Sequence, residues 1–143
     1  MSDRRPLMTA EAAAKRGVRP LARIVSWATA GVDPALMGIG PVPAVHKALA
    51  RAGLTLKDIN LIEINEAFAV QTLSCIKVLG LDSDKVNVRG GAVALGHPIG
   101  ASGARLVLTV ALELQRRGLR TGAAALCGGG GQGDALILRR PQT

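Results

Sequence analysis

The sequence has almost no aromatic residues. Its 143 residues include one Trp, one Phe and no Tyr, although 48% of the residues are apolar. A core built from this composition has to be aliphatic, and the apolar fraction is too high for an intrinsically disordered chain. Modules that bind single-stranded nucleic acid stack bases on aromatic side chains, so that class of protein is disfavoured.

Cysteines and long apolar runs are also scarce. Cys75 and Cys127 are too few for a disulfide framework, which favours a reducing compartment. No apolar run approaches the roughly 20 residues of a membrane span, and no apolar segment of a secretory leader follows the charged N-terminus. We therefore expect a cytoplasmic protein that contacts no membrane.

The net charge of +8 is spread along the chain. The 18 Lys and Arg residues form no run longer than two, so no tail for nucleic acid is present and no nucleic-acid partner is expected. The excess charge fits either solvated surfaces or a bias toward a phosphorylated ligand.

Strand-like and helix-like segments alternate, which is typical of an α/β sheet with parallel neighbours. Residues 1–20 form an N-terminal helix and connector, and residues 21–143 form the main domain. The patterns predict helices at 9–16, 43–52, 66–79 and 101–117, and strands at 21–29, 59–64, 123–126 and 135–138, with short strand-like pieces at 86–88 and 92–95.

The helix at 101–117 has only a narrow polar stripe. The stripe consists of Ser102, Arg105, Thr109, Glu113 and Arg116, and most of the remaining circumference is apolar. A surface helix on one sheet has a wider polar face. We therefore expect this helix to pack on more than one side.

A first candidate site is the segment Asn65-Glu66-Ala67-Phe68, between a predicted strand and a helix. The simpler interpretation is that Asn65 caps the helix. The alternative is that its amide lies at the carboxyl end of the strand, where α/β proteins bind ligands.

A second candidate is His97, in the turn Gly96-His97-Pro98-Ile99-Gly100. A histidine in a rigid, glycine-rich turn between strand and helix is a candidate general base. The same glycines could admit a dinucleotide pyrophosphate at the helix N-terminus. That interpretation requires an acidic residue after the next strand, where Cys127 stands.

A third candidate is Cys127, followed by four glycines. Backbone N–H groups can converge there on an anion such as a developing oxyanion. A buried small residue before a β-hairpin is the alternative, although a hairpin needs only one or two glycines.

Together and in this order, the three segments resemble the C-terminal half of thiolases. Asn65-Glu66-Ala67-Phe68, Gly90-Gly91-Ala followed by Gly96-His97-Pro98-Ile99-Gly100-Ala101-Ser102-Gly103, and Cys127-x-Gly129-Gly130-Gly131-x-Gly133 carry the resemblance, which spans about residues 8–140. It implies a thiolase-like half with a mixed, mostly parallel five-stranded sheet and helices on both faces. Residues 21–143 would be the thiolase C-terminal domain.

The resemblance also implies site residues. His97 would activate a nucleophilic cysteine and contribute to an oxyanion hole, for which Asn65 would hold a water. Cys127 would be the acid/base that moves a proton at the α-carbon, and Gly129 would contribute its N–H to a second oxyanion hole. Ala67 and Phe68 would lie near the pantetheine and acyl group. The substrate would be a coenzyme A thioester, with no further cofactor and no metal.

The nucleophilic cysteine of thiolases lies in an N-terminal half that this sequence does not contain. Cys75 falls deep inside a predicted helix, which favours a packing role. The chain would then be an acyl-CoA C-acyltransferase part, of the kind used in fatty acid metabolism and β-oxidation, inactive without an N-terminal half and homo-oligomeric when complete. A non-catalytic acyl-CoA-binding or interaction subunit is the alternative, and a dinucleotide-binding protein is a third hypothesis.

Overall fold

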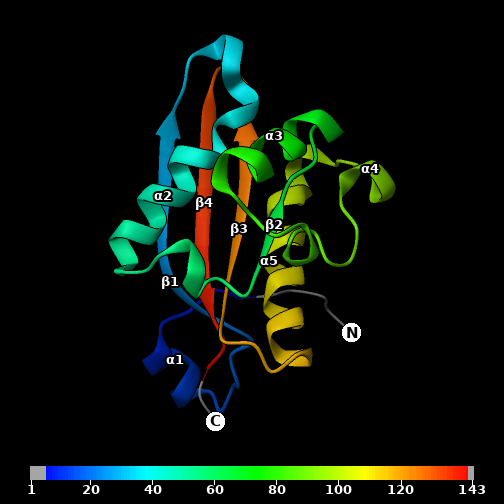
Figure 1. Ribbon diagram of the computed structural model, residues 1–143. Coiled ribbons are helices and arrows are strands. Elements are labelled where there is room, and N and C mark those ends of the chain that lie inside the picture. Colours follow the sequence, from blue (N-terminus) through cyan, green and yellow to red (C-terminus); the bar gives the residue numbers. More distant parts are fainter. Residues whose placement is uncertain (1–5, 142–143) are drawn as a thin grey trace.

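A computed structural model describes residues 6–141 of the chain (Figure 1). The α-helices are α1 (Ala10–Lys15), α2 (Pro41–Ala52), α3 (Ala69–Leu79), α4 (Ala92–Leu95) and α5 (Ile99–Arg116), and short 3₁₀ turns are η1 (Pro34–Ile39), η2 (Leu56–Asp58) and η3 (Ser83–Lys85). The strands are β1 (Arg23–Gly31), β2 (Leu61–Ile64), β3 (Thr121–Gly128) and β4 (Gln132–Arg139). The predicted α/β class is confirmed.

The sheet has the strand order β1-β4-β3-β2. Only β2 and β3 are parallel, whereas β4 pairs antiparallel with both β3 and β1. Within residues 6–141 the sheet therefore has four strands instead of the expected five, and most of its pairings are antiparallel. The direction of β4 has a simple cause: three residues separate it from β3, and a parallel crossover needs a dozen or more.

The expected strand around residues 86–95 is reduced to a single parallel bridge between Ile62 and Val86. Asn87 then adopts a positive φ of 47°, which turns the chain away from the sheet edge. Residues 92–95 form the short helix α4 because, once away from β2, the segment has no strand to pair with.

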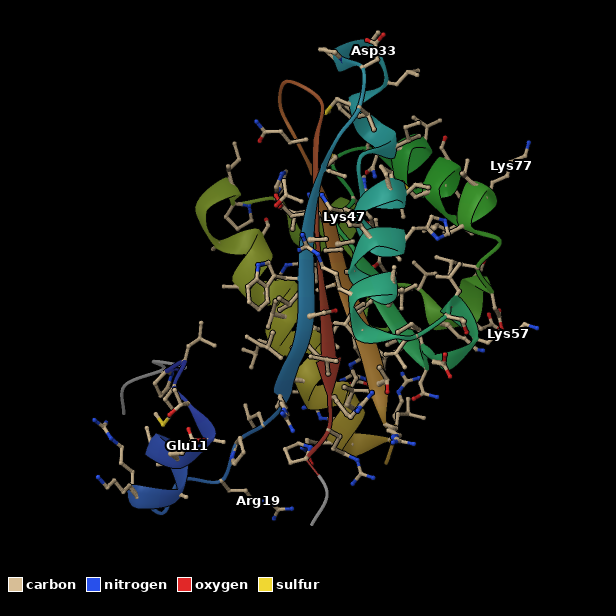
Figure 2. All side chains as sticks on the ribbon, turned by 90° about the vertical axis from the view of Figure 1, so that its left-hand side faces the viewer. Glu11, Arg19, Asp33, Lys47, Lys57 and Lys77 are labelled. Carbon is tan, nitrogen blue, oxygen red and sulfur yellow. The ribbon has the colours of Figure 1, made fainter. Side chains whose placement is uncertain are left out.

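Helices cover both faces of the sheet, as Figure 2 shows with the sheet nearly edge-on. Helix α2 packs on β1 and β4, and α5 packs on the opposite face, mainly on β3 and β2. Ile62 and Ile64 belong to the core on the α2 side, whereas Leu61 belongs to the core on the α5 side. All four residues of β2 are buried, which fits an apolar strand with a helix layer on each face.

Both cores are aliphatic, as the composition predicts, and contain no aromatic side chain among the described residues. Trp27 and Phe68 instead lie on the surface, each about two-thirds exposed. Close packing of α5 on β3 depends on Gly122, where a Cβ atom would lie 2.7 Å from Cγ1 of Val110.

Two of the five residues in the polar stripe of α5 are buried. Ser102 and Glu113 are almost completely inaccessible, and Glu113 forms ion pairs with Arg89, Arg116 and Arg117 at 2.8–3.5 Å. On the other side of the helix, Ala104 is exposed. The side of α5 away from the sheet is therefore only partly covered by the described chain.

Helix boundaries follow the usual capping chemistry at several points. Thr9 accepts a hydrogen bond from the Ala12 backbone N–H at the start of α1. Gly53 and Gly80 end α2 and α3 in the left-handed conformation. No helix within residues 6–141 has the length and apolar character needed to cross a membrane.

Candidate active site

Asn65 and Cys127, two of the predicted site residues, lie at the carboxyl ends of the parallel strands β2 and β3. The backbone N–H of Asn65, just after β2, donates to the carbonyl of Ala125 in β3 at 2.9 Å. Cys127 lies two residues further along β3. Asn65 and Cys127 are thus placed on one edge of the sheet, the edge where α/β sheets bind ligands.

The side chain of Asn65 faces His97 instead of capping a helix. Nδ2 of Asn65 lies 3.3 Å from Nε2 of His97, and Asn65 is only 1% exposed. Helix α3 begins at Ala69, with Phe68 at the cap position and no side-chain capping bond. The capping interpretation of Asn65 is therefore wrong, because α3 begins four residues after Asn65, whose side-chain amide contacts His97 instead.

The hydrogen bonds of His97 define its tautomer. Its Nδ1 lies 2.6 Å from Oγ of Ser102, and that hydroxyl donates to the carbonyl of Pro98 at 3.0 Å. Since the Ser102 proton is used there, its oxygen accepts from Nδ1–H of His97. Nε2 then carries a lone pair, which accepts from the Asn65 amide in this structure and is available to a substrate or nucleophile proton.

Ser102 was not among the predicted site residues. It lies five positions after His97, on the first turn of α5, and the turn at Pro98 brings its hydroxyl back to the imidazole. The sequence signal was its place on the polar stripe of an otherwise apolar helix. A serine at such a position needs a polar partner when it is buried.

One polar atom of this pair has no partner. Oδ1 of Asn65 is buried and accepts no hydrogen bond from any described residue. An unsatisfied buried acceptor costs about 1–3 kcal/mol, so the position is suited to a water or a ligand donor.

Cys127 is half-buried at the end of β3. Burial raises the pKa of its thiol above the ordinary value of 9.0, against a smaller opposing effect of a backbone hydrogen bond. Cys127 is therefore a thiol at neutral pH, the form that donates a proton.

Cys75 is completely buried in α3, and burial also raises its pKa, with the nearby Cys127 contributing in the same direction. Its Sγ contacts the Gln71 amide and donates to the carbonyl of Gly38 at 3.4 Å. The predicted packing role of Cys75 is confirmed.

The glycines after Cys127 form a tight β-hairpin. Gly130 and Gly131 have φ angles of 85° and 92°, and a Cβ at Gly131 would overlap the carbonyl of Val32. Gly129 is exposed at the turn, and within the described chain its amide donates to no backbone carbonyl. Backbone geometry thus favours glycine at positions 130 and 131, and the Gly129 N–H remains available to a ligand.

Ala67 and Phe68 lie in the short segment between Asn65 and α3, half-buried and exposed respectively. A pocket of about 300 Å³ lies next to them and contains neither His97 nor Cys127; it is lined by Glu66, Ala69, Thr72, Leu73, Ile76, Ser83, Val86, Asn87 and Val93. No group of three or more His, Cys, Asp or Glu side chains in residues 6–141 is arranged to hold a metal ion.

Comparisons with known proteins identify the family of the chain. Residues 18–140 match the family described as thiolase, C-terminal domain. Acetyl-CoA acetyltransferases of Rhizobium meliloti and Escherichia coli are 59% and 60% identical to the chain, over 94% of it and 34% of their own length.

Solved structures give the same result. The Bacillus anthracis acetyl-CoA acetyltransferase superposes with a TM-score of 0.91 at 53% identity, covering 94% of this chain and 34% of that one. Human mitochondrial 3-ketoacyl-CoA thiolase in complex with CoA gives 0.91 at 50% identity, over 93% and 34%. The chain spans about a third of the length of these relatives. Because the family match extends over most of the chain, the chain belongs to the thiolase family and corresponds to its C-terminal domain.

Proposed function

We propose that this chain is the C-terminal part of an acyl-CoA C-acyltransferase. In the complete enzyme it would take part in the thiolytic cleavage of 3-ketoacyl-CoA or in the opposite reaction, a Claisen condensation. The observation that carries the proposal is the hydrogen-bonded pair of Asn65 and His97 on the strand edge that also holds Cys127. The names of the relatives, and the CoA complex of one of them, support a coenzyme A thioester as substrate. The proposal includes no further cofactor.

In this proposal, His97 acts through Nε2, taking the proton of a nucleophilic cysteine supplied by another segment. The unpartnered Oδ1 of Asn65 holds a water, whose second O–H is aimed with His97 at the thioester oxygen. The free N–H of Gly129 stabilises a second developing oxyanion. Ala67 and Phe68 contact the pantetheine and acyl group.

Cys127 supplies the proton in the cleavage direction. Attack of the nucleophilic cysteine on the 3-keto carbon breaks the C2–C3 bond and leaves an acyl-cysteine and the enolate of acetyl-CoA. The Cys127 thiol protonates C2 of that enolate, and its thiolate then takes the proton of an incoming CoA thiol. The CoA thiolate removes the acyl group and restores the nucleophile.

The nucleophile itself has to come from outside this chain. Cys75 is inaccessible, and the chain spans only 34% of the length of the relatives. An N-terminal thiolase half or split subunit is therefore the proposed partner, and the complete enzyme would be a homo-oligomer of fatty acid metabolism.

An open apolar surface beside the site supports this partner. Its side chains are 60–87% exposed and are contributed by α3, α4 and the residues next to them: Phe68, Val70, Leu73, Val93, Leu95 and Ile99. Exposed apolar clusters of this kind mark interaction surfaces. Phe68 lies three residues from Asn65 and Ile99 two residues from His97, so a segment that covers this surface reaches the site.

Mixing the chain with the N-terminal two-thirds of the Escherichia coli relative tests the proposal. We expect CoA-dependent cleavage of acetoacetyl-CoA, reduced by at least ~100-fold in His97→Ala and Cys127→Ala. His46→Ala is the matched control, because His46 is exposed on α2. Full activity in both site variants would contradict the assigned roles.

The role of the surface has its own pair of variants. Leu73→Asp introduces a charge into the open apolar surface, and Val78→Asp introduces one at an equally exposed position at the other end of α3. We expect only Leu73→Asp to weaken binding of the N-terminal part in calorimetry. Equal binding of both variants would exclude this surface.

A non-catalytic acyl-CoA-binding or interaction subunit is the second candidate. The absence of an accessible second cysteine in this chain favours it. CoA binding by the chain, without turnover in the mixture, would support this candidate over the first.

A further inference from the structure

The carboxylate of Glu66, next to Asn65, joins two parts of the loop that leads to His97. Oε1 accepts a hydrogen bond from Nδ2 of Asn87 at 2.9 Å, and Oε2 accepts one from the backbone N–H of Val93 at 2.9 Å. Both oxygens are thus engaged within the loop. Gly91, the cap residue of α4, has no side chain to satisfy the first N–H groups of that helix.

Asn87 in turn is bound to the outer edge of β2. Its Oδ1 accepts from the Ile64 backbone N–H at 2.8 Å, and its Nδ2 donates to the Ile64 carbonyl at 2.9 Å. Its own N–H donates to the carbonyl of Ile62. The Asn87 side chain therefore makes the hydrogen bonds that a neighbouring strand would make to Ile64, the last residue of β2.

The backbone of Gly91 lies against the Glu66 carboxylate. A Cβ atom at this position would overlap Cδ and both carboxylate oxygens of Glu66. The contact is possible because residue 91 is glycine. Four residues of α4 and Gly96 then separate Gly91 from His97.

We propose that Glu66 is a positioning residue for His97. Asn65 and Glu66 are adjacent, so the residue that contacts the imidazole and the residue that holds the approaching loop are fixed to each other by one peptide bond. The two hydrogen bonds of Glu66 hold the start of α4 at β2, which places His97 at hydrogen-bond distance from Asn65. The catalytic use of this geometry rests on the proposed function, whereas the geometry itself does not.

The imidazole of His97 reports on this arrangement in the chain alone. Glu66→Gln keeps the size of the side chain and one oxygen for Asn87, but its amide group cannot accept from the Val93 N–H. We expect the ¹⁵N signals of His97 to move from a single Nδ1–H tautomer toward a mixture of tautomers. Unchanged His97 signals in a folded variant would overturn the proposal.

Two further variants complete the experiment. Asp58→Asn is the matched control, because Asp58 accepts the Thr55 N–H in a short turn before β2, far from His97. Gly91→Ala displaces the carboxylate without altering it and should reproduce the change at His97. If Glu66→Gln does not fold, the signals of Gly91→Ala decide the question: unchanged signals there contradict the proposal.

Activity in the mixture with the N-terminal part is the second readout. We expect kcat to fall about tenfold in Glu66→Gln with KM for CoA changed less than about twofold, since a misplaced base affects the chemical step. Loss of the wild-type activity would contradict the proposed function and leave the NMR result standing. A fall in kcat with unchanged His97 signals would contradict the positioning role.

Discussion

Nδ1 of His97 lies 2.6 Å from Oγ of Ser102, and this contact determines which imidazole nitrogen carries the proton. Ser102 is 1% exposed, so water does not compete for the hydroxyl. The hydroxyl donates to Pro98 and can only accept from His97. Nε2 is left as the basic atom, on the side of Asn65.

Ser102→Ala should therefore impair catalysis more than stability. The carbonyl of Pro98 also accepts the backbone N–H groups of Ala101 and Ser102, so it stays satisfied when the hydroxyl is removed. We expect a loss of about 10- to 100-fold in kcat, as for other groups that orient a functional histidine. Ser102→Thr retains a hydroxyl and should retain most activity; an equal loss in both variants would argue against the hydrogen bond as the cause.

Glu63 should make the stability of the fold depend on pH. Its carboxylate is completely buried on β2, accepts no side-chain hydrogen bond within the described chain, and has a pKa raised by burial to about 7, although Arg105 opposes the shift. A raised pKa in the folded state means that the folded chain binds the proton more tightly than the unfolded chain. The free energy of unfolding should therefore fall as the pH rises from about 4.5 to about 7.

The size of this effect follows from the shift of the pKa. A change from 4.5 to about 7 corresponds to roughly 3 kcal/mol. Urea unfolding at several pH values would measure the change, with Glu63→Gln as the comparison. If the variant and the wild type lose equal stability over this range, Glu63 is not the group that titrates.

The two cysteines should differ in their reaction with iodoacetamide. Cys127 is half-buried beside the hairpin, and Cys75 is fully enclosed by α3 and its neighbours. Burial raises both pKa values above 9.0, so alkylation of Cys127 should be slow near neutral pH and faster as the pH rises. Mass spectrometry of the labelled chain measures both sites; modification of Cys75 before Cys127 would contradict the structure.

Local patterns were sufficient to predict most elements of the fold. The alternation of strand-like and helix-like segments placed the main helices and strands within a few residues. Strand pairing was less predictable because it depends on contacts between distant segments. The antiparallel addition of β4 follows from a three-residue turn, whose role is visible only once the ends of both strands are known.

The candidate site shows the same division. His97 and Asn65 could be found from their places at strand and helix ends, and their proximity is confirmed. The roles of Ser102 and Glu66 could not be predicted in this way. Ser102 contacts His97 because the chain folds back at Pro98, and Glu66 contacts Val93, which is distant in sequence. The sequence pattern began the helix at residue 66, whereas α3 begins at Ala69, so of the two interpretations of Asn65 the capping one was wrong.

Gly122 and Gly103 lie in opposite packing environments, so alanine at these positions should change the stability in opposite directions. Gly122 lies on β3 under α5, where a Cβ atom would meet Val110 at 2.7 Å, whereas a Cβ at Gly103 within α5 would have no neighbour within 4 Å. Gly122→Ala should lower the free energy of unfolding by about 1–3 kcal/mol through overpacking. Gly103→Ala should raise it by about 0.5–1 kcal/mol, because alanine restricts the unfolded chain and favours the helix.

A double-mutant cycle identifies the cause of the Gly122 effect. Val110→Ala removes the methyl group that the new Cβ would meet, so Gly122→Ala should cost less in that background than in the wild type. Chemical denaturation of the two single variants and the double variant measures the coupling. Strict additivity of the two substitutions would show that the close approach of α5 to β3 does not determine the need for glycine at position 122.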